Sequence, residues 1–275
     1  MNELRARSSA DLIRLIEGCT ITEPHISGNM AVSGLVDANA ELQRELLSFD
    51  LALDLQKLTI DETGNVPSLV FNTDQSILIR AGEAVLGGGK QDRVVRESAI
   101  IDGRRSVDVF CIEAGRWTPS NQGWIHVDVP VSLRRLILSG ADQNQVWGHV
   151  AELLSLWGIS SQTGALGAIY ESFRGQFSMR AARFGRWDKQ IGMIVTIDNV
   201  VMGVEMFGDI MSFGRDSMSL LTDAYVPNAM QRTEGTLTVS HVRKAVTDFL
   251  EDLQSDARCV EIVEHKGKLA YASAI

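Results

Sequence analysis

Short runs rich in valine, isoleucine and phenylalanine follow one another between residues 66 and 117 of this 275-residue chain. Turn-forming pieces separate them, namely Asn72-Thr73-Asp74, three consecutive glycines and Asp102-Gly103. β-Branched and aromatic runs between such separators predict antiparallel strands, and Asp-Gly is a strong signal for a two-residue hairpin. We therefore predict a meander of strands here, which limits the fold to classes that contain an antiparallel sheet.

The hydrophobic period changes from two to about 3.6 further along the chain. Apolar residues at helical spacing predict one amphipathic helix over 143–157 and another over 240–254, and Asp198-Asn199 and Lys266-Gly267 predict hairpins. Strands and helices are grouped without a βαβ rhythm, which favours the α+β class. The predicted fold is a single α+β domain over residues 1–275, with a mostly antiparallel sheet core and several packed helices.

Composition disfavours several function classes. A net charge of -9 and a pI near 5.1 argue against a broad nucleic-acid or anionic-membrane surface. No apolar run approaches the ~20 residues of a membrane span, and the first residues lack the apolar core of a signal peptide, so we expect a cytoplasmic protein. The 3 cysteines are far apart, which predicts free thiols and neither a disulfide framework nor a zinc site.

A glycine-rich loop, "LGGGKQDRVV" at residues 86–95, raises the question of ligand binding. It fails the Walker A pattern, because Ala84 replaces the first glycine and Gln91 follows the lysine, and it fails the dinucleotide pattern G-x-G-x-x-G. Glycines can still direct successive N–H groups into one anion-binding concavity, with Lys90 and Arg93 at its rim. The alternative is a bulged turn that needs glycine only for its geometry.

Two sequence blocks around this loop resemble a known family. They are G-x-K-Q-x-R at residues 88–93 and V-x-V-x-C-x-E-x-G-R-W at residues 107–117. The chain resembles the ARG and rhodanese-phosphatase-superfamily-associated protein domain family over about residues 20–275. It departs from the usual pattern in its first 50 residues and over 118–140. This is a prokaryotic family in which no catalytic residue is assigned, so none is carried over.

The resemblance also implies a context, because the family is named for genomic association with ADP-ribosylglycohydrolases and rhodanese-type phosphatases. It implies a nucleotide-derived anion, related to ADP-ribose or NAD, as the small-molecule partner. For a module that binds such a ligand, we consider two roles, as an accessory to ADP-ribose or NAD metabolism or in defence against phage. A second copy of the chain, or a protein from the same operon, is the protein partner to consider. The resemblance names no cofactor.

The two blocks give the candidate ligand-binding residues. Arginine suits bidentate phosphate contacts and tryptophan suits stacking on a base, and strand alternation predicts that Glu113 follows Cys111 onto one face. The predicted site consists of Gly88, Gly89, Lys90, Gln91, Arg93, Glu113, Arg116 and Trp117. In the alternative, Lys90 or Arg93 pairs with Glu83 or Glu113 in an internal lattice that only maintains the fold.

Three functions stay open on the sequence. The first is a ligand-binding or sensor module, the second is a hydrolase or transferase on the same ligand with Glu113 as general base, and the third is a structural or assembly protein. No spacing demands a metal, although glutamates at 62, 83, 113 and 205 end strand-like runs. His149 with Glu152 and His126 with Asp128 form only weak motifs, so we predict no metal site.

Overall fold

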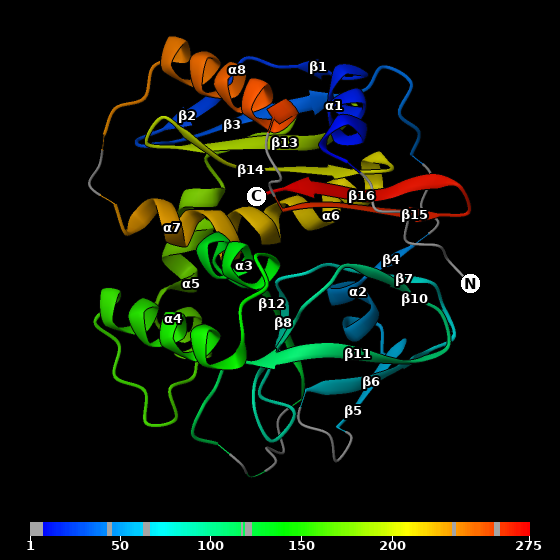
Figure 1. The fold of residues 1–275 in the computed structure, drawn as a ribbon, viewed down its shortest axis with the longest axis vertical. Helices are drawn as coiled ribbons and strands as arrows, with labels where there is room; N and C mark the ends of the chain where they lie inside the picture. The colour runs from blue at the N-terminus through cyan, green and yellow to red at the C-terminus, as the bar shows by residue number, and fades with distance from the viewer. Residues whose placement is uncertain are drawn as a thin grey trace. The chain divides into compact units, whose positions relative to one another are not determined.

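The computed structural model describes residues 8–42, 46–62, 67–116, 118, 123–232, 235–255 and 259–275. The chain divides into two compact units, each with its own sheets (Figure 1). The first unit comprises residues 1–44, 179–221 and 228–275, and the second comprises residues 45–178 and 222–227. Both units combine helices with mostly antiparallel strands, so the fold class is α+β. Among the described helices, none is long and apolar enough to cross a membrane.

The first unit is built on a seven-stranded sheet. Its strands follow the order β1-β3-β13-β14-β16-β15, and β2 also pairs with β3. The strands are β1 Thr20–Ile21, β2 His25–Ser27, β3 Met30–Val36, β13 Gln190–Ile197, β14 Val200–Phe207, β15 Val260–His265 and β16 Lys268–Ala274, and the helices are α1 Ser9–Glu17, α6 Ile210–Ser219 and α8 Val239–Ser255.

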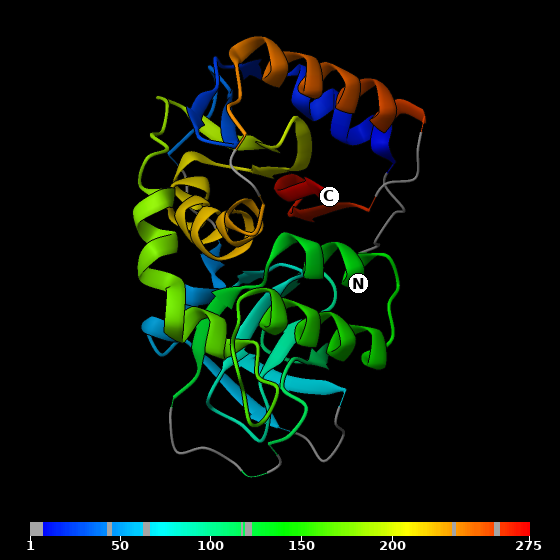
Figure 2. The ribbon, with the colours of Figure 1, turned by 90° about the vertical axis from the view of Figure 1, so that its left-hand side faces the viewer.

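Helices cover both faces of this sheet. Leu12 of α1 and Phe249 of α8 share one core cluster with Ile194 of β13, and Figures 1 and 2 show α1 and α8 side by side over this face. On the other face, Phe213 of α6 packs edge-on against Phe207 of β14. Burial on both faces explains why β13 and β14 read as nearly continuous apolar runs.

The second unit contains two smaller sheets. Its six-stranded sheet has the order β12-β8-β9-β11-β6-β5, and its three-stranded sheet has the order β10-β7-β4. The strands are β4 Leu47–Ser48, β5 Leu58–Glu62, β6 Ser68–Thr73, β7 Ile77–Ile79, β8 Glu83–Leu86, β9 Arg93–Val95, β10 Ala99–Ile101, β11 Arg104–Cys111 and β12 Ile125–Asp128, and the helices are α2 Phe49–Asp54, α3 Val131–Leu138, α4 Gln143–Leu156 and α5 Gly167–Ala181. Helix α5 ends in the first unit, because the boundary falls between Ser178 and Met179, and the π-helical segment η1 Leu220–Tyr225 and the helix α7 Val226–Met230 also cross from one unit to the other.

The core of the second unit forms where the two sheets meet α2. Phe49 of α2, Phe71 of β6 and Ile79 of β7 belong to one buried cluster. At the far end of β11, the side chain of Gln143 hydrogen bonds to both the N–H and the C=O of Cys111, each at 2.8 Å. This two-point contact fixes where the chain leaves the strand, and so fixes the loop that follows.

The structure confirms most of the predicted elements. The helices expected over 143–157 and 240–254 are α4 and α8. The hairpins at Asp198-Asn199 and Lys266-Gly267 are also confirmed, with positive φ at all four residues as a type I′ turn requires.

The predicted hairpin at Asp102-Gly103 is wrong, and so is the simple meander. Asp102-Gly103 joins β10 to β11, but β10 pairs with β7 whereas β11 pairs with β6 and β9. The turn therefore connects two different sheets. The pairing of β10 and β11 with strands far away in the sequence decides which sheet each of them joins. The strands within 68–111 and those within 190–207 lie in different sheets and different units. A single domain over 1–275 stays a prediction.

Candidate functional site

A cavity of about 520 Å³ lies in the second unit. Its volume falls within the range of ~300–1,000 Å³ that is usual for small-molecule sites. Strand β8, strand β12, the loops after β8, β11 and α4, and the first two turns of α5 contribute to its wall. The lining residues are Leu86, Gly87, Asp92, Glu113, Arg116, Ile125, Val127, Ser161, Thr163, Ala165, Gly167, Ala168, Tyr170, Glu171 and Arg174.

Arg116 connects the two sequence blocks at the wall of this cavity. Its Nε and Nη2 donate to Oε2 of Glu113 at 2.9 and 2.8 Å, and Nη2 also donates to Oδ1 of Asp92 at 3.1 Å. Its Nη1 donates to the carbonyl oxygen of Gly89. Each guanidinium nitrogen of Arg116 is therefore already bound within the protein.

Glu113 is held from several sides as well. Besides Arg116, its Oε2 accepts from the backbone N–H of Asp92 at 3.2 Å, and its Oε1 accepts from the hydroxyl of Thr163 at 2.7 Å. Glu113 comes after the end of β11 at Cys111, so the chain turn, and not strand alternation, sets its direction. A carboxylate with both oxygens committed serves best as a positioning group for its neighbours.

Asp92 differs from Glu113 because one of its oxygens stays open. Oδ1 accepts from the N–H of Gly87 at 2.8 Å and from Arg116, whereas no described residue donates to Oδ2. Burial raises the pKa of the Asp92 carboxyl to about 6, with a further rise from the charge of Glu113 that the N–H of Gly87 and Arg116 partly offset. Asp92 therefore brings to the cavity a carboxyl group with a pKa of about 6.

A second arginine, Arg174 of α5, lines the same cavity. Its Nη2 donates to Oδ2 of Asp223 at 2.8 Å, and its side chain is 43% exposed. Burial raises the pKa of Asp223 to about 7 although Arg174 opposes the shift. Tyr170, one helical turn before Arg174, donates its hydroxyl to the carbonyl oxygen of Asp128 at 2.8 Å. Helical spacing thus places Tyr170 and Arg174 on the same face of α5.

The glycine loop is shaped by close packing. Gly87 has a φ of 82°, which favours glycine. A Cβ at Gly88 or Gly89 would collide with the ring of Trp124, and one at Gly89 would also meet Glu62. Gly88 and Gly89 therefore let the backbone pass directly under an indole ring, whereas Gly87 lines the cavity.

The structure brings some of the sequence-predicted residues to the cavity and places others elsewhere. Glu113 and Arg116 line it, whereas Gly88, Gly89, Lys90, Gln91 and Arg93 do not. The side chain of Lys90 is exposed, and its backbone N–H donates to Glu62 at 2.9 Å. Trp117 lies outside the described residues.

Arg93 and Gln91 belong to a buried network behind the cavity. Arg93 is paired in register with Cys111 across β9 and β11; it donates to the Cys111 sulfur and to Oε1 of Gln91, and it lies 3.8 Å from Glu62. These are contacts of the kind that the internal-lattice alternative predicts for Arg93. The carboxylate near Arg93 is Glu62, however, and not Glu83 or Glu113. Arg93 thus joins two strands of the sheet and does not reach the cavity.

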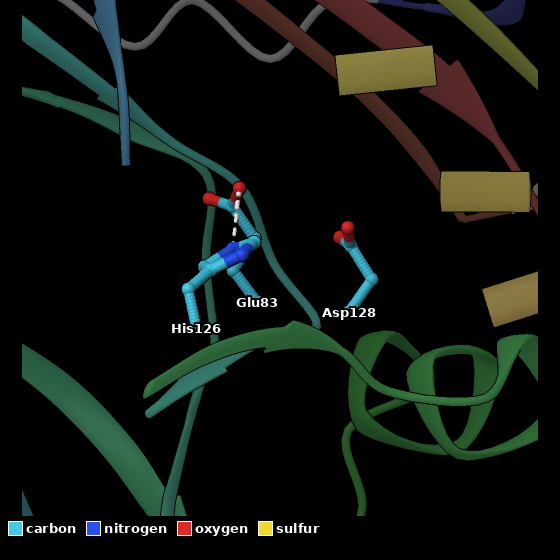
Figure 3. A group of neighbouring side chains, drawn as sticks. All are labelled: Glu83, His126 and Asp128. Atoms are coloured by element: carbon cyan, nitrogen blue, oxygen red, sulfur yellow. Dashed lines mark hydrogen bonds and ion pairs between the residues drawn. The ribbon is translucent and has the colours of Figure 1, made fainter. Parts of the chain in front are cut away.

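A separate buried cluster forms around Glu83, His126 and Asp128 (Figure 3). Glu83 of β8 and Asp128 of β12 are paired in register. His126 lies two residues before Asp128 on β12, and therefore on the same face of the sheet. One ligand atom from each lies within 4.8 Å of the others, an arrangement that could suit a metal ion.

An internal cation already occupies this cluster, however. Nη2 of Arg80 lies 2.7 Å from Glu83 and 3.1 Å from Asp128. Burial alone would lower the pKa of His126, but the hydrogen bond and charge of Glu83 outweigh it and raise that pKa to about 9. Two cations therefore balance the two carboxylates, and a metal would have to displace a proton from His126 and compete with Arg80. We assign no metal site here.

Sequence reasoning missed Asp92, Thr163, Tyr170 and Arg174 as cavity residues. Asp92 lies inside the glycine block and could have been found there, because it is the carboxylate beside the loop cations. Tyr170 and Arg174 recur at helical spacing in a predicted helix-or-loop region, but nothing local indicates what that face contacts. Thr163 comes from a loop whose position depends on long-range packing.

Comparison with known protein families gives a match over most of the chain. The family model described as ARG and Rhodanese-Phosphatase-superfamily-associated Protein domain matches residues 18–273, which is nearly the whole chain. No curated protein and no solved structure matches this chain.

Proposed function

We propose a function for a chain that belongs to the ARG and Rhodanese-Phosphatase-superfamily-associated Protein domain family: its cavity in the second unit binds a small nucleotide-derived anion related to ADP-ribose or NAD. The family blocks supply Asp92, Glu113 and Arg116 to one wall of this cavity, Gly87 lies just before the first block, and α5 supplies Arg174 to another wall. We further propose that the protein acts in the cytoplasm and takes part in prokaryotic defence.

The single observation that carries the proposal concerns Arg174, a cationic residue in the cavity wall whose guanidinium group is only partly hydrogen bonded within the protein. Nη2 of Arg174 binds Asp223, and its Nε and Nη1 have no partner among the described residues. Free guanidinium donors in a partly buried wall are suited to bind phosphate oxygens. Apolar side chains at Leu86, Ile125 and Val127 line the same cavity and can pack against a base or a sugar ring.

A thermal-shift screen of the full chain with ADP-ribose, NAD, AMP and inorganic phosphate tests this proposal. A ligand at 100 times its dissociation constant stabilises the folded protein by about 2.7 kcal/mol. We expect ADP-ribose to raise the melting temperature of the parent and to have a much smaller effect on Arg174→Gln. Arg104→Gln is the matched control, because Arg104 is exposed and its partner Asp61 is exposed too. No shift with any of these compounds would contradict the proposal.

Hydrolysis or group transfer on the same ligand is the second candidate function. Asp92 favours it, since an open carboxylate oxygen with a pKa near 6 suits a general base. Asp92 fits that role better than Glu113, whose oxygens are both committed. Incubation of ADP-ribose with the protein, followed by chromatography of the products, tests this function. Product formed by the parent but not by Asp92→Asn would support it.

A further inference from the structure

The polar groups of the cavity differ in what they can still bind. Arg116 and Glu113 are occupied by each other and by their neighbours. Ser161 accepts from the N–H of Ala165 at 2.9 Å, and Tyr170 donates to a backbone carbonyl. Among the described buried charged groups of the wall, the open acceptor is therefore Oδ2 of Asp92, and the exposed carboxylate of Glu171 also lines the cavity. The open donors of a charged group are those of Arg174.

These two groups require opposite hydrogen-bonding roles of a ligand, because Asp92 needs a donor and Arg174 needs an acceptor. A carboxylate oxygen accepts hydrogen bonds and repels a phosphate oxygen, which at neutral pH offers few or no donors. A sugar hydroxyl can donate to it, and the two lone pairs of Oδ2 can accept from one hydroxyl or from a neighbouring pair. Arg174 attracts the phosphate for the same electrostatic reason that Asp92 repels it.

Asp92 is also fixed well enough to select a ligand. Its Oδ1 is held by the N–H of Gly87 and by Arg116, and its side chain is only 7% exposed. Oδ2 lies close to Gly167, where a Cβ would approach it to 3.3 Å. A carboxylate that is held on one side and shielded on the other presents its open oxygen in one direction.

We infer that the cavity takes a sugar phosphate, with a ribose hydroxyl donating to Oδ2 of Asp92 and a phosphate group accepting from Arg174. This inference rests on the proposed function and adds to it the class of ligand and the residue that recognises the sugar. Asp92 is then the specificity-determining residue, since a phosphate without a nearby hydroxyl leaves its open oxygen unpaired.

Calorimetric titration of the full chain with ADP-ribose, 2′-deoxy-ADP-ribose and 2″-deoxy-ADP-ribose tests the inference. The two analogues each lack one hydroxyl, on the adenosine ribose and on the terminal ribose respectively. We expect one of them to bind the parent about tenfold more weakly than ADP-ribose, which is the scale of one charge-assisted hydrogen bond.

Variants separate recognition of the sugar from attraction of the phosphate. In Asp92→Asn the amide oxygen keeps the contacts of Oδ1, so an NH₂ group replaces the open acceptor, and the preference should fall to within about twofold. Arg174→Gln should weaken all three ligands and leave their ratio unchanged. Asp108→Asn removes an exposed carboxylate of β11 outside the cavity and should change neither affinity nor preference.

The outcomes distinguish this inference from the proposed function. Equal affinity of the parent and Asp92→Asn for ADP-ribose, with weaker binding by Arg174→Gln, would overturn the inference and leave the proposed function standing. A hydroxyl preference that persists in Asp92→Asn would also overturn it. Binding of none of the three compounds would overturn the proposed function and the inference together.

Discussion

Arg116 holds Asp92 by only one carboxylate oxygen, with 3.1 Å between Nη2 and Oδ1, and leaves the other oxygen open. The same guanidinium holds Glu113 through Nε and Nη2. Asp92 and Glu113, which come from different family blocks, thus both bind Arg116 but differ in what they can still bind. Glu113 orients Arg116 and the backbone of Asp92, whereas Asp92 is available to a ligand.

Replacing Asp92 by Asn should make stability less dependent on pH. Burial raises the pKa of Asp92 from 3.8 to about 6, so between these values the folded state binds more protons than the unfolded state. The free energy of unfolding therefore falls as pH rises through this window. From pH 4 to pH 7 we expect the parent to lose about 2 kcal/mol that Asp92→Asn does not lose.

Urea unfolding of both proteins at pH 4, 5, 6 and 7 measures this difference, and all other titrating groups cancel in the comparison. Asp108→Asn is the matched control for the loss of a carboxylate, because Asp108 is exposed and lies outside the cavity. Parallel pH profiles for the parent and Asp92→Asn would show that Asp92 titrates at its ordinary pKa.

Arg93→Ala and Lys90→Ala should differ sharply although both remove a cation from the glycine block. Arg93 is 5% exposed and bonds to Gln91 and Cys111 near Glu62, so its loss should destabilise the protein by about 2–4 kcal/mol. Lys90→Ala should change stability by no more than about 0.5 kcal/mol. Thermal denaturation without ligand compares them, and equal losses would contradict these placements.

His126→Gln should remove a loss of stability at alkaline pH. The hydrogen bond and charge of Glu83 raise the pKa of His126 from 6.5 to about 9 against the effect of burial. Protonation of His126 stabilises the fold fully below pH 6.5, and this contribution is lost as pH rises through 9. Between pH 7 and pH 9 the parent should lose about 2 kcal/mol more than the variant does.

Guanidinium chloride unfolding at pH 7 and pH 9 tests this cluster. His149→Gln is a suitable control for the loss of an imidazole, because His149 pairs with an exposed glutamate on α4 and lies outside this cluster. A loss of the same size in the parent and His126→Gln would mean that His126 is neutral in the folded protein at pH 7.

The sequence predicts the local elements better than their partners. Helical periodicity locates α4 and α8, and Asp198-Asn199 locates a hairpin, because spacing and turn chemistry act within a few residues. At Asp102-Gly103 the turn exists, but its flanking strands pair in different sheets. Strand pairing depends on contacts far apart in the chain, which local patterns do not contain.

The candidate site shows the same difference between local features, which the sequence predicts, and long-range contacts, which it does not. The family blocks predict Glu113 and Arg116, which line the cavity, but the direction of a side chain within a block is decided by packing. Arg93 turns toward Cys111 and Glu62, whereas Asp92, its neighbour, reaches the cavity. Arg174 comes from α5, about 60 residues beyond the second block, and only the fold brings it to the same cavity.

Ala168→Phe gives the most direct test that this cavity is the ligand site. Ala168 lines the cavity at the start of α5, so a phenyl ring there fills space without removing a charge or a hydrogen-bonding side chain. In a calorimetric titration with ADP-ribose, the parent should bind with a stoichiometry of about one, and the variant, checked for folding by thermal denaturation, should show no measurable binding. Equal binding by the folded variant would place the ligand elsewhere, and no binding by the parent would contradict the proposed function itself.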